Sequence, residues 1–311
     1  MELTERSSAI LMVHKARKNG LPFWNKRQQS DGDQIVVAFE AFQQLSRVSI
    51  RPMTAISAML DIHEDICSCA ERKRAAMIIL PFHKHQRFDG TLETTRTEFR
   101  LVNRRVLEHA PCSVGILVDR GLGGSTHVSA RNFSSEITVL FFGGRDDHEA
   151  VSYGLRMSEH PGINLTIVQF LAISDIPGDV VSINVNYISN TLVGSSDETF
   201  VAEIKQKISN NSSIKFEEKA IQSAAEIVDV VRLFSRCNLF VVGRMQEGQV
   251  TGALNMKGDC PELGPVGNLL TSPDFSTSAS VLVVQQYNEQ KNLNKVSSKV
   301  VVLSEEDSET E

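Results

Sequence analysis

Long apolar runs are scarce in this sequence of 311 residues. A membrane-spanning helix needs about 18 or more consecutive apolar residues, whereas the longest apolar stretches here, 137–142 and 165–173, have the length of buried strands. The first six residues, MELTER, contain no basic segment followed by an apolar one, so they do not resemble a secretory signal peptide. We therefore expect none of these residues to cross a membrane.

Cysteine and positive charge are also in short supply. The five cysteines are odd in number and scattered, which disfavours a disulfide framework and favours a reducing compartment. The formal net charge is -6, so bulk electrostatics gives no support to a nucleic-acid partner. Part of the negative excess lies in residues 304–311, within a C-terminal tail (289–311) that we expect to be unfolded.

The rest of the composition is that of an ordinary globular protein, with 41% hydrophobic and 23% charged residues. Strand-like and helix-like segments alternate, which predicts an α/β fold with a parallel sheet covered by helices. The strand candidates are short continuous apolar runs, as expected for strands that are buried on both faces. They lie at 76–80, 114–118, 137–142, 165–173, 239–242 and 281–284, with weaker candidates at 47–51 and 214–220.

The predicted helices are marked by apolar residues at helical spacing. Stripes of this kind occupy 35–45, 62–70, 99–107 and 150–155, and a first helix is predicted from Leu3, Ile10, Val13 and Ala16. Two later helices are expected to begin with capping boxes, at Ser195 and Ser223, each followed three residues later by a glutamate.

These segments predict two tandem doubly wound units with strand order 3-2-1-4-5, consistent with a length that favours two domains. We place the first unit at 1–119, a glycine- and serine-rich linker at 120–136, and the second unit at 137–288. The second unit has all its strands. The first opens with a helix and shows only three later strands, so we expect it to lack its first two strands.

Several segments resemble known families. The sequence HAPCSVGILV (109–118) resembles the last helix-to-strand junction of universal stress proteins, and NLFVVGR (238–244) resembles their fourth strand. Tandem degenerate copies of that fold form the cytosolic C-terminal region of plant cation/proton exchangers of the monovalent cation:proton antiporter-2 family, which the chain resembles more closely. That resemblance rests on MELTER (1–6), RPMTAIS (51–57), HEDIC (63–67), IILPFHK (78–84), VDRG (118–121) and FFGGRDD (141–147).

The resemblance implies a division of labour. In that family an upstream membrane domain exchanges potassium or another monovalent cation for protons, at endomembranes or at the plasma membrane. This chain would be the cytosolic regulatory domain, with the upstream membrane domain or a second copy of itself as partner, and a role in cation and pH homeostasis. Met1 would then be an internal methionine of a longer protein. The alternative is a freestanding tandem universal-stress-type protein that binds a nucleotide.

Universal stress proteins that bind ATP use a glycine-rich loop after the fourth strand, where backbone amides approach the phosphates. The equivalent loop of the first unit, 81–90, has one glycine, and the second unit has six glycines at a different spacing. Gly243 and Arg244 are therefore weak nucleotide candidates, and a structural loop is the preferred interpretation. Asp146 and Asp147 follow the first strand, where stress proteins place an aspartate against adenine, but capping of the next helix is preferred.

His83 and His85, beside Lys84, are candidates for metal binding or pH sensing. Neighbouring cations oppose both roles, and no cysteine or carboxylate cluster in the sequence completes a tetrahedral set. We therefore prefer a packing or anion-binding loop, and expect no metal and no cofactor. Ser304 and Ser308 are candidate phosphorylation sites. No Ser/His/Asp or Cys/His trio is indicated, so we do not expect an enzyme.

Overall fold

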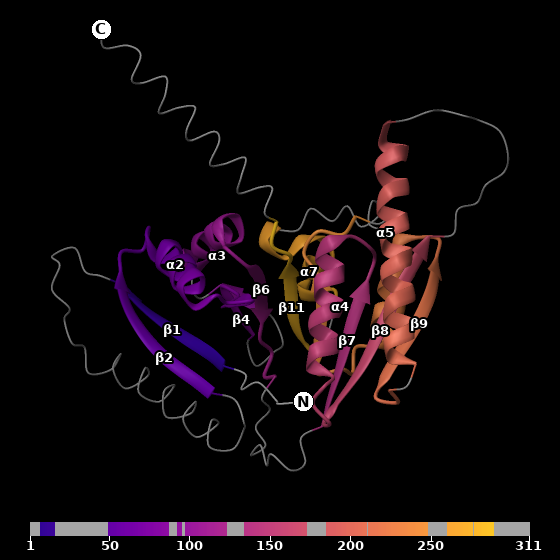
Figure 1. Cartoon of the computed structure of the whole chain (residues 1–311), viewed down its shortest axis with the longest axis horizontal. Coiled ribbons are helices and arrows are strands. Elements are labelled where there is room, and N and C mark those ends of the chain that lie inside the picture. Colours follow the sequence, from indigo (N-terminus) through magenta and orange to yellow (C-terminus); the bar gives the residue numbers. More distant parts are fainter. Residues whose placement is uncertain are drawn as a thin grey trace, which may run out of the picture.

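The computed structural model describes residues 7–15, 49–86, 92–94, 97–122, 134–172, 185–209, 211–247, 260–275 and 277–288. Its centre is a seven-stranded sheet of order β3-β6-β11-β10-β7-β8-β9 (Figure 1). In that order the strands are Met77–Pro81, Ser113–Val118, Ser280–Gln285, Leu239–Gly243, Ser135–Phe141, Ile163–Ala172 and Ile214–Ile221. Two small sheets accompany it: parallel β1 (Ser7–Lys15) with β2 (Ser49–Ser57), and antiparallel β4 (Lys84–Gln86) with β5 (Leu92–Thr94).

The second half of the chain has the predicted strand arrangement, because β9-β8-β7-β10-β11 is the order 3-2-1-4-5. Its helices are α4 (Arg145–Met157), α5 (Val185–Ile208), α6 (Ala224–Leu233) and α7 (Gly264–Thr271), with a short 3₁₀ helix η2 (Pro261–Leu263). The capping box at Ser223 is confirmed, since its hydroxyl accepts a hydrogen bond from the Glu226 amide. The box expected at Ser195 is wrong, because α5 begins ten residues earlier.

Helices cover the two faces of the sheet, because alternate residues of each buried strand point in opposite directions. Val139 and Phe141 of β7 pack in one core with residues of α4 and α5. Leu140 and Phe142 belong to the other core, which α6 and α7 share with the first-half helices α2 (Ile62–Lys73) and α3 (Thr97–His109). This second core therefore contains residues from both halves of the chain.

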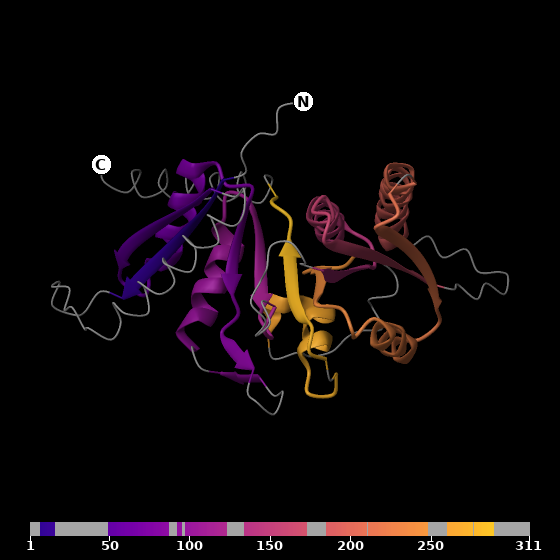
Figure 2. The same cartoon turned by 90° about the horizontal axis from the view of Figure 1, so that it is seen from below.

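The two halves meet where β6 pairs with β11, which we call the junction (Figure 2). This pair is antiparallel, with Val118 opposite Val281 and Val114 opposite Gln285. Gly115 lies at a close approach, because a Cβ there would come within 2.9 Å of Leu282 Cδ1. The junction makes the sheet continuous from the first half to the second.

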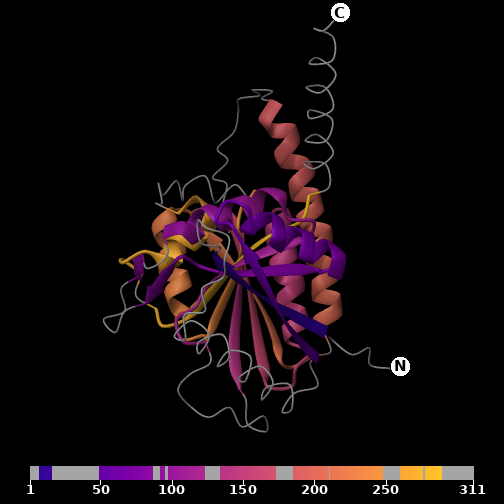
Figure 3. The same cartoon turned by 90° about the vertical axis from the view of Figure 1, so that its left-hand side faces the viewer.

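The first half differs from the prediction at its start. Residues expected to form a helix form the strand β1 instead (Figure 3), and the short strands β4 and β5 were not predicted either. The apolar run of residues 9–13 is equally typical of a buried strand, and periodicity alone does not separate the two. The helices predicted at 62–70 and 99–107 are confirmed as α2 and α3. The stripe at 35–45 and the acidic tail lie outside the described residues.

Candidate functional site

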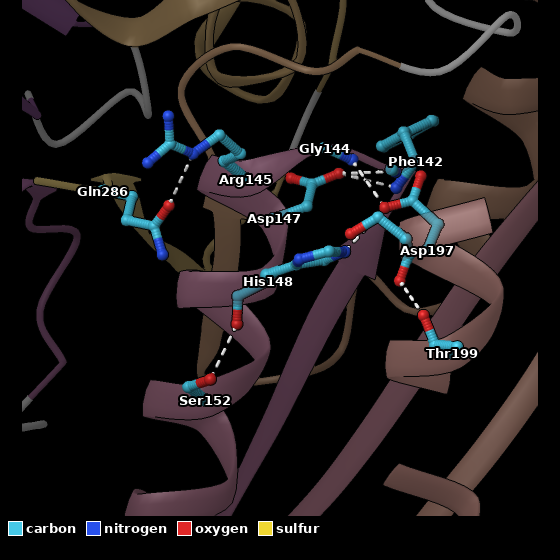
Figure 4. A network of polar contacts seen from close by, with 11 residues as sticks. Phe142, Gly144, Arg145, Asp147, His148, Ser152, Asp197, Thr199 and Gln286 are labelled. Carbon is cyan, nitrogen blue, oxygen red and sulfur yellow. Dashed lines mark hydrogen bonds and ion pairs between the residues drawn. The ribbon is translucent and has the colours of Figure 1, made fainter. Parts of the chain in front are cut away.

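The candidate nucleotide residues gather where β7, β10 and β11 end. Asp147, in the first turn of α4, is fully buried. Its Oδ2 accepts hydrogen bonds from the amides of Phe142 at 2.7 Å (Figure 4) and Gly143 at 3.0 Å. Its Oδ1 accepts one from the Gly243 amide at 2.9 Å. Burial raises the pKa of Asp147 well above its usual value, although the three amides act to lower it. Asp147 thus joins the ends of β7 and β10.

Asp146 makes a second set of links. Its Oδ2 accepts a hydrogen bond from the Met245 amide (3.0 Å) and its Oδ1 accepts one from the Gln286 amide (2.8 Å). Burial raises the pKa of Asp146, and these amides lower it. Helix capping describes only part of this arrangement, because the pair also binds amides just beyond β10 and β11. Contact with adenine stays a prediction.

Gly243 and Arg244 lie beside the aspartates. A Cβ on Gly243 would come within 2.6 Å of the Asp147 nitrogen, so glycine permits β10 to approach α4 this closely. The Arg244 guanidinium donates to Gln285 Oε1 at 2.8 Å and to the Pro261 carbonyl at 3.3 Å, and burial lowers its pKa. Packing therefore accounts for Gly243. Internal hydrogen bonds hold the two outer nitrogens of Arg244, whereas its buried Nε has no hydrogen-bond partner among the described residues.

A cavity of about 200 Å³ lies between the two halves beside Asp146. Its first-half lining includes Leu107 and Glu108, and its second-half lining includes Arg145 and Arg244. Pockets that enclose drug-sized ligands usually measure about 300–1,000 Å³. The volume that the described residues leave in this cavity is below that range, so it would not enclose a whole nucleotide.

A polar pair that sequence reasoning missed connects α4 with α5 in the same region. His148 Nε2 lies 2.6 Å from Asp197 Oδ1, and Asp197 also accepts a hydrogen bond from the Gly144 amide at 3.2 Å (Figure 4). The imidazole stacks on Phe200 with ring centroids 4.0 Å apart. The two residues lie on different helices, and no local motif relates them.

A second cluster surrounds His83, which follows β3 and is 2% exposed. Its Nδ1 lies 3.0 Å from Glu262 Oε1, and one ligand atom each of His83, Cys260 and Glu262 lies within 4.8 Å of the others. All three residues are buried. No local sequence pattern indicated this cluster, because Cys260 and Glu262 reach His83 from the other half of the chain.

Burial, then Lys84 and Arg100, lower the pKa of His83 to about 4. The imidazole is therefore neutral near neutral pH, which argues against the pH-sensor hypothesis and agrees with a packing role. Lys84 and His85 lie in β4, and the His85 side chain is outside what the structure describes. Ser304 and Ser308 also lie outside the described residues.

No helix in the described part of the chain is long and apolar enough to cross a membrane. The sheet and its helices define an α/β domain whose second half has the strand order 3-2-1-4-5. Family models match it in two parts: the plant cation/H(+) antiporter domain over residues 1–122, and the plant cation/H(+) antiporter C-terminal domain over residues 134–285.

Named relatives agree. The chain is 59% identical over 293 residues to cation/H(+) antiporter 18 of Arabidopsis thaliana, covering 92% of this chain and 36% of that protein. It is 53% identical over 304 residues to cation/H(+) antiporter 17 of the same plant, covering 92% and 37%. A universal stress protein from Archaeoglobus fulgidus has a similar structure at 11% identity, with a TM-score of 0.44 and coverage of 88% and 86%. The chain belongs to the plant cation/H(+) antiporter family and spans about a third of the length of these relatives.

Proposed function

We propose that this chain is a cytosolic regulatory domain of a monovalent cation/proton antiporter, and that a membrane domain of the same protein carries out the exchange. The observation that carries the proposal is the match itself: identity of 59% runs over 92% of this chain but only 36% of a named antiporter. This favours an antiporter domain over a freestanding nucleotide-binding protein.

The proposed mechanism is conformational. The junction makes one sheet from the two halves, so a partner that binds and moves one half also moves the other. Docking on the membrane domain, or on a second copy of this chain, would then bias transport between more and less active states. Transport chemistry itself is assigned to the membrane domain.

The test is proton-coupled flux of potassium or rubidium in vesicles that contain either the full-length antiporter or the same protein without this domain. We expect the protein without this region to keep coupled flux but to show an altered rate or an altered dependence on cytosolic pH. Equal amounts of the two proteins in the vesicles provide the control. Identical flux at every pH would refute regulation, and loss of all flux from correctly inserted protein would assign the region an essential part in transport instead.

A further inference from the structure

Two buried polar atoms near the junction face each other without a hydrogen bond. His83 Nδ1 and Glu262 Oε1 are 3.0 Å apart, yet each lacks a hydrogen-bond partner among the described residues. The side chains of both residues are 2% exposed. A buried polar atom left without a partner destabilises a fold by about 1–3 kcal/mol. A positive species shared by the two atoms, either a proton or a metal ion, would remove that cost.

Cys260 adds a third donor atom to the same space. The three ligand atoms, from an imidazole, a thiol and a carboxylate, lie within 4.8 Å of one another. Tetrahedral zinc, with bonds of about 2.0–2.3 Å, places its ligand atoms roughly 3.5 Å apart. Side-chain adjustment of about 1 Å would therefore bring the set to zinc geometry.

We propose that His83, Cys260 and Glu262 bind a divalent transition-metal ion, with Zn²⁺ the best fit to the donor set. Nitrogen and thiolate sulfur are the ligands that zinc prefers, and a carboxylate oxygen completes a three-residue site that leaves a fourth position open. The ion would join the first half of the chain, through His83, to the second half. The site is independent of the proposed regulatory function.

The local charges are compatible with binding. Burial and then the Glu262 carboxylate raise the pKa of the Cys260 thiol, and Lys84 beside it acts to lower that pKa. Metal binding replaces the thiol proton, which passes to solvent, so the ion adds one net positive charge to the site. Arg100 Nε lies 3.8 Å from Glu262 Oε1, and its side chain is 48% exposed.

The experiment uses the whole chain after removal of metals with a chelator. Calorimetric titration with Zn²⁺ should give one ion per chain, with release of about one proton per ion as judged in buffers of different ionisation enthalpy. Titration with Co²⁺ should give a thiolate-to-cobalt charge-transfer band and the visible bands of a tetrahedral ion. Zn²⁺ should also raise the thermal unfolding midpoint of the unmodified chain.

The variants are Cys260→Ser, His83→Gln and Glu262→Gln, with Cys67→Ser and His109→Gln as matched controls away from the cluster. Each cluster variant should lose affinity by roughly 100-fold or more, since changes to outer-shell residues already cost 10–100-fold. Absence of binding by the unmodified chain, a cobalt spectrum without a thiolate band, or undiminished affinity in folded cluster variants would each overturn the proposal. If a cluster variant fails to fold, the cobalt spectrum and the shift in the thermal unfolding midpoint of the unmodified chain decide the question.

Discussion

The three amides bound by Asp147 give a quantitative test of how the strand ends are held together. Asp147→Ala removes both acceptor oxygens and leaves the amides of Phe142, Gly143 and Gly243 without their partner. Each unsatisfied buried donor costs about 1–3 kcal/mol. The free energy of unfolding should therefore fall by about 3 kcal/mol or more, a large part of the total for a typical domain.

Asp147→Asn should be milder, because asparagine keeps one acceptor oxygen. That oxygen can accept from Phe142 and Gly143, which share Oδ2 in the native arrangement, while the new NH₂ group faces the Gly243 amide. One orphaned donor predicts a loss of about 1–3 kcal/mol. The expected order of stability is native, then asparagine, then alanine.

Urea unfolding followed by far-UV circular dichroism measures these differences by linear extrapolation. Asp229→Ala is the matched control, since its side chain is 75% exposed and its ion pair with Arg232 is a surface contact expected to contribute less than about 1 kcal/mol. The interpretation that Asp147 holds the strand ends together would fail in either of two cases. The free energy of unfolding of Asp147→Ala could lie within about 1 kcal/mol of the native value, or Asp147→Asn could lower it as much as Asp147→Ala does.

Three further predictions concern other parts of the fold. Burial raises the pKa of Cys67 from 9.0 to about 11. Near pH 8 the Cys67 thiol of the native chain should therefore be alkylated about 100-fold more slowly than that of the unfolded chain, and its rate should rise as the pH rises toward 11. Equal rates would contradict this. Gly243→Ala places a Cβ within 2.6 Å of the Asp147 nitrogen and should destabilise the chain by about 1–3 kcal/mol in urea, whereas exposed Ser152→Ala should not. Ile116 lies at a fully buried position of β6, so Ile116→Ala should lower the free energy of unfolding by about 2–5 kcal/mol. It should also reduce the hydrogen-exchange protection of β11 across the junction. Unchanged protection of β11 would show that the two halves unfold separately.

Local sequence signals predicted most of the second half. Buried parallel strands such as β7 and β10 appear as continuous apolar runs, and α6 carries a capping box whose bonds the structure shows. The same signals failed for β1, because a short apolar run suits a helix or a strand equally well. They also gave no indication of the hairpin β4–β5, whose strands have three residues each.

The candidate sites were predictable only in part. Asp146, Asp147, Gly243 and Arg244 were identified through the resemblance to universal stress proteins, which place nucleotide contacts after the first and fourth strands. The partners of His83 were not, because Cys260 and Glu262 belong to the other half and reach it only in the folded chain. The antiparallel pairing of β6 with β11 likewise depends on tertiary packing, which no local pattern encodes.

The junction also has a mechanical consequence. Two domains joined by a flexible linker can rotate freely, but β6 and β11 are held by a ladder of backbone hydrogen bonds along five residue pairs. Bending the chain at this point would require the ladder to break and would expose Val114, Ile116 and Val281, all fully buried. A displacement imposed at the outer edge of β3 should therefore be transmitted to β9 by rotation of the whole sheet as one rigid body.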